Sequence, residues 1–231
     1  MSHGLVVLTS VIPLDAIAAL AREVNILTTA ALQAPLEDGV GCFGEIREPL
    51  FRCDLKLHPS ESLVVVLQAL VAACADPLTE CLGPDPGLCE LSALSSDPGA
   101  RRQPLHCDTT DENEDDAGVG NVAPHIVSVF LPLSDLDPSM GPTLMLPGSH
   151  KASAHRKARS LGPQALLRDH PHVVMDLSAG DVVLMDSRLW HCGGANQSSR
   201  RRTLLVVSFN SKRVGDEGNP SHPPFTEESD G

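Results

Sequence analysis

Two residues that can bind a metal stand two positions apart in segment 103–108, which reads QPLHCD. In a β-strand, side chains at positions i and i+2 point to the same face, roughly 6.5–7 Å apart. His106 and Asp108 would therefore place an imidazole and a carboxylate side by side. These groups are two of the three protein ligands of a 2-His-1-carboxylate iron site. The leading candidate for the third ligand is His191, far along the chain.

The elements around these residues must bring the third ligand to the other two. The turn Gly180-Asp181 begins a predicted strand that runs to His191, and Arg202 begins the next apolar strand after a turn-rich connection. If these two strands pair as a hairpin, His191 and Arg202 lie close together across the ladder. A metal-bound histidine beside a cation suits a dicarboxylate, because one carboxylate can chelate the metal while the other pairs with the guanidinium.

The second half of the sequence alternates short apolar runs with turns, which is typical of a β-sandwich or jelly roll. We expect strands there at 126–131, 143–146, 172–177, 181–186 and 203–209, and earlier strands at 4–8, 50–57 and 88–94. Apolar residues at helical spacing predict helices over 14–24 and 63–73, the second of them buried. Residues 33–48 are expected to form a loop, and 151–168 a loop with a short helix.

The length of 231 residues fits one domain, because all-β sandwiches and barrels often reach this size as a single unit. After Val214 the sequence turns to Gly, Pro, Ser and acids. Such a composition cannot bury enough apolar surface to fold. We therefore predict a single domain over 1–214 and a flexible C-terminal tail over 215–231.

Charge and cysteine content restrict the partners and the compartment. Lys and Arg total 17 against 30 Asp and Glu, and the net charge of −13 repels nucleic acid and anionic membranes. No run approaches a membrane span, and no secretory leader opens the sequence. The 7 cysteines show no tight pairing pattern. We therefore predict an intracellular, cytoplasmic protein with neither nucleic-acid nor membrane partners.

An ordered set of motifs resembles the phytanoyl-CoA dioxygenase-like (PhyH) family of iron(II)- and 2-oxoglutarate-dependent oxygenases. The set includes the strand at 4–8 with the helix after it, and the QPLHCD segment. It continues with GPTLMLPGSHK at 141–151 and closes with Gly180-Asp181 leading to His191 and Arg202. A His-x-Asp pair alone occurs widely, so the order of the motifs over residues 4–210 carries the resemblance.

The resemblance implies a mainly β fold, the double-stranded β-helix (jelly roll, cupin-like) with flanking helices. It implies that His106, Asp108 and His191 are the catalytic iron ligands. The cofactors would be Fe(II), 2-oxoglutarate as co-substrate, and O₂. The implied reaction hydroxylates a small-molecule substrate and releases succinate and CO₂. Because residue 108 is a carboxylate, and not alanine or glycine, the site resembles an oxygenase and not a halogenase of similar fold.

The same resemblance implies three co-substrate contacts. Arg202 would pair with the distal carboxylate of 2-oxoglutarate, while Gln103 and Thr143 would form hydrogen bonds to the co-substrate. Arg200 and Arg201 precede Arg202 directly. We choose Arg202 because it adjoins the apolar strand.

Other interpretations stay open at this point. A metal-binding jelly roll without turnover, with a binding or regulatory role, would carry the same ligands. Cys107 and Cys192 flank two ligands and suggest zinc, but in extended segments both thiols point away from the metal face. The acidic segment 111–116 is interpreted as a solvated loop, with a substrate-selecting lid as the alternative. The sequence identifies neither the substrate nor the oligomeric state.

Overall fold

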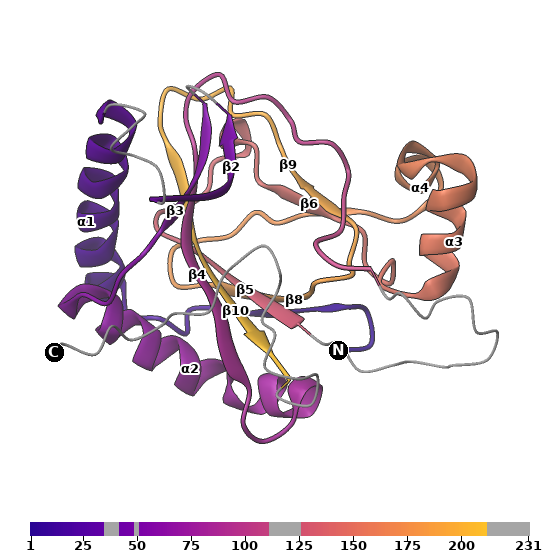
Figure 1. Ribbon diagram of the computed structural model, residues 1–231, viewed down its shortest axis with the longest axis horizontal. Helices are drawn as coiled ribbons and strands as arrows, with labels where there is room; N and C mark the ends of the chain where they lie inside the picture. The colour runs from indigo at the N-terminus through magenta and orange to yellow at the C-terminus, as the bar shows by residue number, and fades with distance from the viewer. Residues whose placement is uncertain (35–41, 49–50, 111–125, 212–231) are drawn as a thin grey trace, which may run out of the picture.

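The computed structural model describes residues 1–34, 42–48, 51–110 and 126–211. Within these residues the chain forms two antiparallel sheets, one of seven strands ordered β1-β8-β5-β10-β4-β3-β2 and one of three ordered β7-β6-β9 (Figure 1). The strands are β1 Leu5–Leu8, β2 Phe43–Glu48, β3 Arg52–Lys56, β4 Gly87–Ser96, β5 Ile126–Pro132, β6 Thr143–Met145, β7 Val173–Val174, β8 Val182–Asp186, β9 His191–Gly193 and β10 Arg202–Asn210. The helices are α1 Leu14–Gln33, α2 Glu61–Leu82, α3 Ala152–Leu161 and α4 Pro163–Asp169, with a 3₁₀ turn at Pro138–Met140. The predicted jelly-roll fold is confirmed.

Helices α1 and α2 pack on the seven-stranded sheet, at the opposite end of the molecule from α3 and α4 (Figure 1). Helix α2 begins after Ser60, whose hydroxyl accepts a hydrogen bond from the Leu63 N–H. Such a cap stabilises a helix by about 1 kcal/mol. The buried residues of α2 recur every three or four positions, beginning with Leu63, Val66, Leu70 and Cys74. This spacing aims one apolar stripe at the sheet.

Helix α2 is longer than the sequence analysis expected. An 18-residue window within Glu61–Leu82 has a mean hydropathy of 1.8, so by length and composition alone this helix could cross a membrane. The expectation that no run approaches a membrane span was therefore wrong for this segment. The core helix of a soluble protein passes the same test, and the buried stripe of α2 belongs to the core that it shares with α1 and the sheet.

Strand β10 separates two environments, because successive side chains of a strand point to opposite faces of the sheet. Leu205 and Val207 have no exposed surface and pack in the core with α1 and α2. Val206 and Ser208 line a cavity on the other face. Strand β10 pairs with β4 on one side and β5 on the other. It therefore lies inside the sheet and contributes side chains to both the core and the cavity.

The three-stranded sheet closes the cavity from the opposite side. Thr143 of β6 and His191 of β9 line the same cavity as Val206 of β10. A second apolar cluster joins the two sheets, because Met145 of β6 packs with Phe130 and other residues of the larger sheet. The site is therefore built between two sheets that pack together, as expected of a jelly roll.

Two local expectations were wrong. The predicted loop over 33–48 includes β2, which pairs with β3 at the edge of the large sheet and buries Phe43 in the core. Segment 151–168 holds two helices instead of one, divided at Gly162, whose φ of +81° is unfavourable for other residues. The acidic segment 111–116 and the tail 215–231 lie outside the described residues. The single domain over 1–214 therefore stays a prediction.

Candidate metal centre and co-substrate pocket

An isolated β-bridge brings the first and third predicted ligands together. The His106 N–H donates to the His191 carbonyl at 3.0 Å, and the His191 N–H donates to the His106 carbonyl at 2.8 Å. The Asp108 N–H donates to the Ser187 carbonyl at 2.9 Å. These backbone contacts, and not the continuous strand expected over 103–108, place the three ligand residues side by side.

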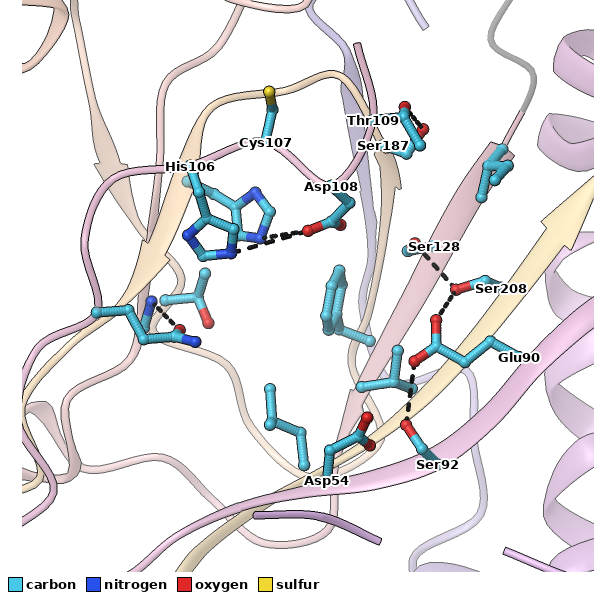
Figure 2. A pocket seen from close by; sticks show the side chains of 18 of the residues that line it. Asp54, Glu90, Ser92, His106, Cys107, Asp108, Thr109, Ser128, Ser187 and Ser208 are labelled. Carbon is cyan, nitrogen blue, oxygen red and sulfur yellow. Dashed lines mark hydrogen bonds and ion pairs between the residues drawn. The ribbon is translucent and has the colours of Figure 1, made fainter. Parts of the chain in front are cut away.

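The side chains of the three predicted ligands converge. One possible ligand atom from each of His106, Asp108 and His191 lies within 4.8 Å of the other two. Asp108 Oδ1 lies 3.5 Å from His191 Nε2 and 3.8 Å from His106 Nε2 (Figure 2). A single metal ion can bridge groups at this separation, and two imidazoles with one carboxylate are the donor set of the mononuclear iron triad.

Backbone hydrogen bonds fix the tautomer of both histidines. His106 Nδ1 lies 2.9 Å from the Pro104 carbonyl, and His191 Nδ1 lies 2.9 Å from the Leu189 carbonyl. A carbonyl oxygen only accepts, so each Nδ1 must carry the proton. The lone pair is therefore on Nε2, the atom of each ring that faces Asp108. Such outer contacts orient metal-binding histidines in known sites.

The surroundings of His106 favour the neutral ring that a metal requires. Burial lowers the pKa of His106 below its usual value, and the His191 ring lowers it further. The centroids of the two rings are 4.4 Å apart, so two imidazolium charges would repel each other at close range. A neutral imidazole is the form that binds a divalent metal.

The predicted hairpin between the strands of His191 and Arg202 is wrong. Strand β9, which contains His191, pairs with β6 in the small sheet, whereas β10, which contains Arg202, pairs with β4 and β5 in the large one. The chain leaves the large sheet after β8 at a turn in which the Asp186 carboxylate accepts from the Arg188 backbone and guanidinium. His191 and Arg202 nevertheless line one cavity, across the two sheets.

Arg202 is a buried cation that faces this cavity. Its side chain has no exposed surface, and it donates to Ser96 Oγ at 3.1 Å and to the Gly141 carbonyl. Burial lowers the pKa of Arg202 to about 10, and the nearby charge of Arg52 acts in the same direction. In the described part of the chain no carboxylate pairs with Arg202. A buried charge without a counter-ion is costly, so this position suits an anionic group of a ligand.

The adjacent arginines have other contacts. Arg201 pairs with Asp97, with 2.5 Å between Nε and Oδ1, and also donates to Asn25 and Thr29 of helix α1. Arg200 is exposed. Of the three successive arginines, Arg202 is the one that lines the cavity.

Gln103 and Thr143 line the cavity beside Arg202. Gln103 Oε1 accepts from the Gly193 N–H at 2.8 Å, so its amide NH₂ remains as a donor. A Cβ at Gly193 would lie 2.6 Å from Gln103 Oε1, 2.8 Å from Arg52 Nη1 and 3.2 Å from Arg202 Nη2. The missing side chain at Gly193 therefore lets these polar groups converge.

The cysteines that flank the ligands are not part of the candidate metal group, which holds His106, Asp108 and His191. Cys192 is fully buried, and its sulfur accepts hydrogen bonds from Arg102 at 3.4 Å. The Cys107 sulfur points away from the ligands (Figure 2). This arrangement does not favour the zinc interpretation.

The cavity of about 450 Å³ also contains residues that the sequence analysis did not identify. They are polar side chains on the strands of the large sheet: Asp54, Glu90, Ser92, Ser128 and Ser208 (Figure 2). Arg52, another unpredicted residue, is buried beside Gly193. The alternation of polar and apolar residues in 87–96 was the available signal, but the same alternation describes a strand whose polar face meets solvent.

Jelly rolls that hold a metal through two histidines and one carboxylate belong to the mononuclear non-haem iron class, and this chain has that fold and a His-Asp-His group that could hold a metal ion. Comparison with known families narrows the class. The model of the phytanoyl-CoA dioxygenase (PhyH) family matches residues 1–204. The chain belongs to that family, as the resemblance predicted.

Curated relatives cover part of the chain. Dioxygenase easH of Epichloe festucae var. lolii is 34% identical over 120 residues, which span 50% of this chain and 60% of the relative. Dioxygenase hkm4 of Aspergillus hancockii is 31% identical over 120 residues, 51% of this chain and 36% of the relative. The chain thus aligns with between about a third and three fifths of their length.

Solved structures agree on the fold over nearly the whole chain. AviO1 from Streptomyces viridochromogenes Tue57 matches with a TM-score of 0.66 and 22% identity, covering 97% of this chain and 94% of that one. HygX from Streptomyces hygroscopicus, crystallised with nickel, 2-oxoglutarate and hygromycin B, matches with a TM-score of 0.62 and 16% identity, covering 92% and 84%. At these identities the similarity establishes the fold.

Proposed function

We propose that this chain is a non-haem Fe(II)- and 2-oxoglutarate-dependent dioxygenase that hydroxylates a small-molecule substrate and releases succinate and CO₂. One observation carries the proposal. A single cavity contains both the converging His-Asp-His group and a fully buried arginine that has no carboxylate partner among the described residues. A metal ion would bind the His-Asp-His group, and a dicarboxylate bound to that metal would also pair with the buried arginine.

The chain's own residues bind and orient the reactants. His106, Asp108 and His191 would hold the iron through one carboxylate oxygen and two Nε2 atoms, and would leave its remaining positions open. Arg202 would pair with the distal carboxylate of 2-oxoglutarate, assisted by the Gln103 amide and the Thr143 hydroxyl. Bound iron and 2-oxoglutarate would supply the oxidising chemistry with O₂. The protein's contribution is to position the substrate against that centre.

Comparisons support a small-molecule substrate. The structure of HygX contains hygromycin B, and the structure of the epimerase SnoN contains Fe³⁺, α-ketoglutarate and nogalamycin RO. Both proteins share the fold of this chain at low identity. The family name does not define the substrate, so phytanoyl-CoA is not inferred from it.

The proposal is tested by anaerobic titration of Fe(II) and 2-oxoglutarate into the metal-free protein, monitored by the visible metal-to-ligand charge-transfer band. The wild type should develop the band, and His106→Ala should not. Arg202→Met keeps much of the buried volume but removes the charge. It should need roughly 100-fold more 2-oxoglutarate, about 3 kcal/mol for a buried charge-assisted pair.

No band in a correctly folded wild type would overturn the proposal. A band without succinate formation, with or without added substrates, would instead identify a metal-binding jelly roll without turnover. Succinate release that requires iron separates these two functions.

We also propose that the protein works inside the cell, in the cytoplasm, without nucleic-acid or membrane partners. All 7 cysteines are free thiols, as expected in a reducing compartment. The net charge of −13 opposes binding to polyanions. Localisation of a tagged full-length chain in its native cells tests this proposal.

A further inference from the structure

A second, smaller cavity lies between the two sheets, next to the cavity of the candidate metal centre. About 10 Å³ of it is open to the centre of a water-sized molecule. By the same measure, a cavity of roughly 10–15 Å³ holds one such molecule. Apolar side chains that do not line the larger cavity surround this space: Leu136, Met145, Met175, Leu177, Val183 and Leu204.

The small cavity and the larger one share part of a wall. Phe130 of β5 and Thr143 of β6 line both cavities, and each of these residues is 8% exposed. One of them belongs to the large sheet and the other to the small sheet. A molecule that passes between these two side chains therefore enters the cavity that contains His106 and Asp108.

The polar groups around the small cavity do not suit a water molecule. Among the described residues that line it, Thr143 carries the one polar side chain. Two backbone carbonyls in the lining already accept hydrogen bonds, since the Met175 N–H donates to Thr143 at 2.8 Å and the Leu136 N–H donates to Leu177 at 3.0 Å. A buried water is held by roughly two to four polar partners, so an apolar molecule is the better occupant.

The lining suits a small molecule that binds through dispersion. Apolar cavities in proteins take up apolar molecules such as xenon. The thioethers of Met145 and Met175 both face the space, and methionine sulfur is polarizable. Of the reactants in the proposed reaction, 2-oxoglutarate is charged and larger than the space, whereas O₂ is apolar and close to water in size.

We propose that the small cavity is a binding site for O₂, from which the gas enters the larger cavity between Phe130 and Thr143. This inference rests on the proposed function for its use of O₂, because an oxygenase consumes that gas at the metal centre. The site would raise the local concentration of O₂ beside the ligands without a channel that water or 2-oxoglutarate could follow.

Binding of O₂ is tested by NMR on the metal-free chain, labelled with ¹³C in the methionine methyl groups. Dissolved O₂ is paramagnetic and accelerates the relaxation of nuclei that it contacts. Met145 lines the cavity, Met140 lines neither cavity, and each is 1% exposed. Under O₂ pressure, with N₂ as the reference, relaxation of the Met145 methyl should accelerate roughly threefold more than that of Met140, because an apolar cavity concentrates an apolar gas. Equal acceleration of the two methyls would overturn the inference.

A matched pair of variants locates the site. Val183 and Val182 are neighbours on β8 with no exposed surface, but Val183 lines the small cavity and Val182 packs in the core with α1 and α2. Val183→Ile adds a methyl group at the lining and should reduce the acceleration at Met145 to the level of Met140. Val182→Ile adds the same group on the opposite face of the sheet and should leave the acceleration unchanged.

A third variant does not depend on fitting an extra group into a packed interior, which can itself destabilise a protein. Leu177→Ala enlarges the small cavity and should increase the acceleration at Met145, because more gas is held there. If the acceleration at Met145 is unchanged in both Val183→Ile and Leu177→Ala, the gas is not bound in this cavity.

Delivery of O₂ to the metal centre is tested by the O₂ dependence of succinate formation in the Fe(II)-loaded protein with 2-oxoglutarate. Val183→Ile should raise the KM for O₂ about threefold, because it removes the site that concentrates the gas. The maximal rate and the affinity for 2-oxoglutarate should stay as in the wild type, and Val182→Ile should change none of these quantities. An unchanged KM for O₂ in Val183→Ile would show that the gas reaches the metal by another route.

Failure of this inference can be distinguished from failure of the proposed function. The relaxation measurement uses metal-free protein and does not depend on turnover. Iron-dependent succinate formation without preferential relaxation at Met145 would show that the gas site alone is wrong. Preferential relaxation at Met145 in a protein that never forms succinate would leave the gas site in place and overturn the proposed function.

Discussion

The two faces of the seven-stranded sheet differ in composition, although the same strands build both. On the helix side of β10, Leu205 and Val207 are fully buried among apolar neighbours. On the cavity side, Arg202, Val206 and Ser208 line the pocket. Leu205 and Val207 thus belong to the core, while Arg202, Val206 and Ser208 belong to the site, because side chains alternate along a strand.

One face of the sheet therefore stabilises the fold, while the other face provides the residues of the candidate site. Apolar burial on the helix side stabilises the fold at roughly 25 cal/mol per Å². A buried charge on the cavity side, such as Arg202, contributes little to stability, and charged groups in such surroundings cluster at functional sites. Substitutions on the two faces should therefore have separable effects.

The largest functional effect is expected at the cavity side, for Asp108→Ala. The iron loses its only carboxylate ligand among the proposed three, so succinate formation should fall at least 1000-fold, about 4 kcal/mol in transition-state free energy. The Asp108 side chain is 37% exposed, so the melting temperature of the metal-free protein should change little. Parallel measurement of succinate release and thermal unfolding checks both halves. A large fall in the melting temperature would show that the two faces are not separable here.

The converse effect is expected on the helix side, for Leu205→Ala. Leu205 has no exposed surface, and truncating a buried leucine lowers the free energy of unfolding by about 2–5 kcal/mol. The folded fraction should bind Fe(II) and 2-oxoglutarate as the wild type does. Urea unfolding and metal titration measure the two quantities. Leu88→Ala removes the same atoms from a residue that is 48% exposed, and should cost far less stability.

The sequence predicted the fold, and which candidate site residues would lie together, better than it predicted how the strands pair. A His-x-Asp spacing and an arginine at the start of an apolar strand are local signals, and the structure brings those residues to one cavity. The partner of a strand is a non-local property. After β8 the chain turns at Asp186 and Arg188, and His191 then lies in the small sheet. The alternation of polar and apolar residues along the strands does not indicate this change of sheet.

The carboxylates of Asp54 and Glu90 in the cavity lining were missed for a related physical reason. Glu90 and Asp54 stand in strands whose alternating pattern also describes a sheet with one face in water. The sequence shows which residues share a face of the strand, but not whether that face contacts solvent or another part of the protein. Only the second sheet, packed over the first, turns the polar face into the lining of a cavity.

A smaller effect, expected at Gly193, tests how tightly the co-substrate end of the cavity is built. The Cβ of Gly193→Ala would lie under 3 Å from Gln103 Oε1 and Arg52 Nη1, so at least one of these groups must move. We expect 2-oxoglutarate to bind about tenfold more weakly, about 1.4 kcal/mol. Iron affinity should stay within a few-fold, because the ligand histidine of β9 keeps its backbone bridge to His106.

Calorimetric titration of 2-oxoglutarate into the Ni(II)-loaded variant measures this change, and Gly193→Val provides a graded comparison. The valine should weaken 2-oxoglutarate binding further, because its two methyl groups extend beyond the Cβ toward Arg202, whose Nη2 lies only 3.2 Å from that Cβ position. Unchanged affinity in both folded variants would mean that the co-substrate does not occupy the convergence of Gln103 and Arg202. In that case 2-oxoglutarate would bind elsewhere on the cavity side of the sheet, and Arg202 of β10 would not have the role proposed for it.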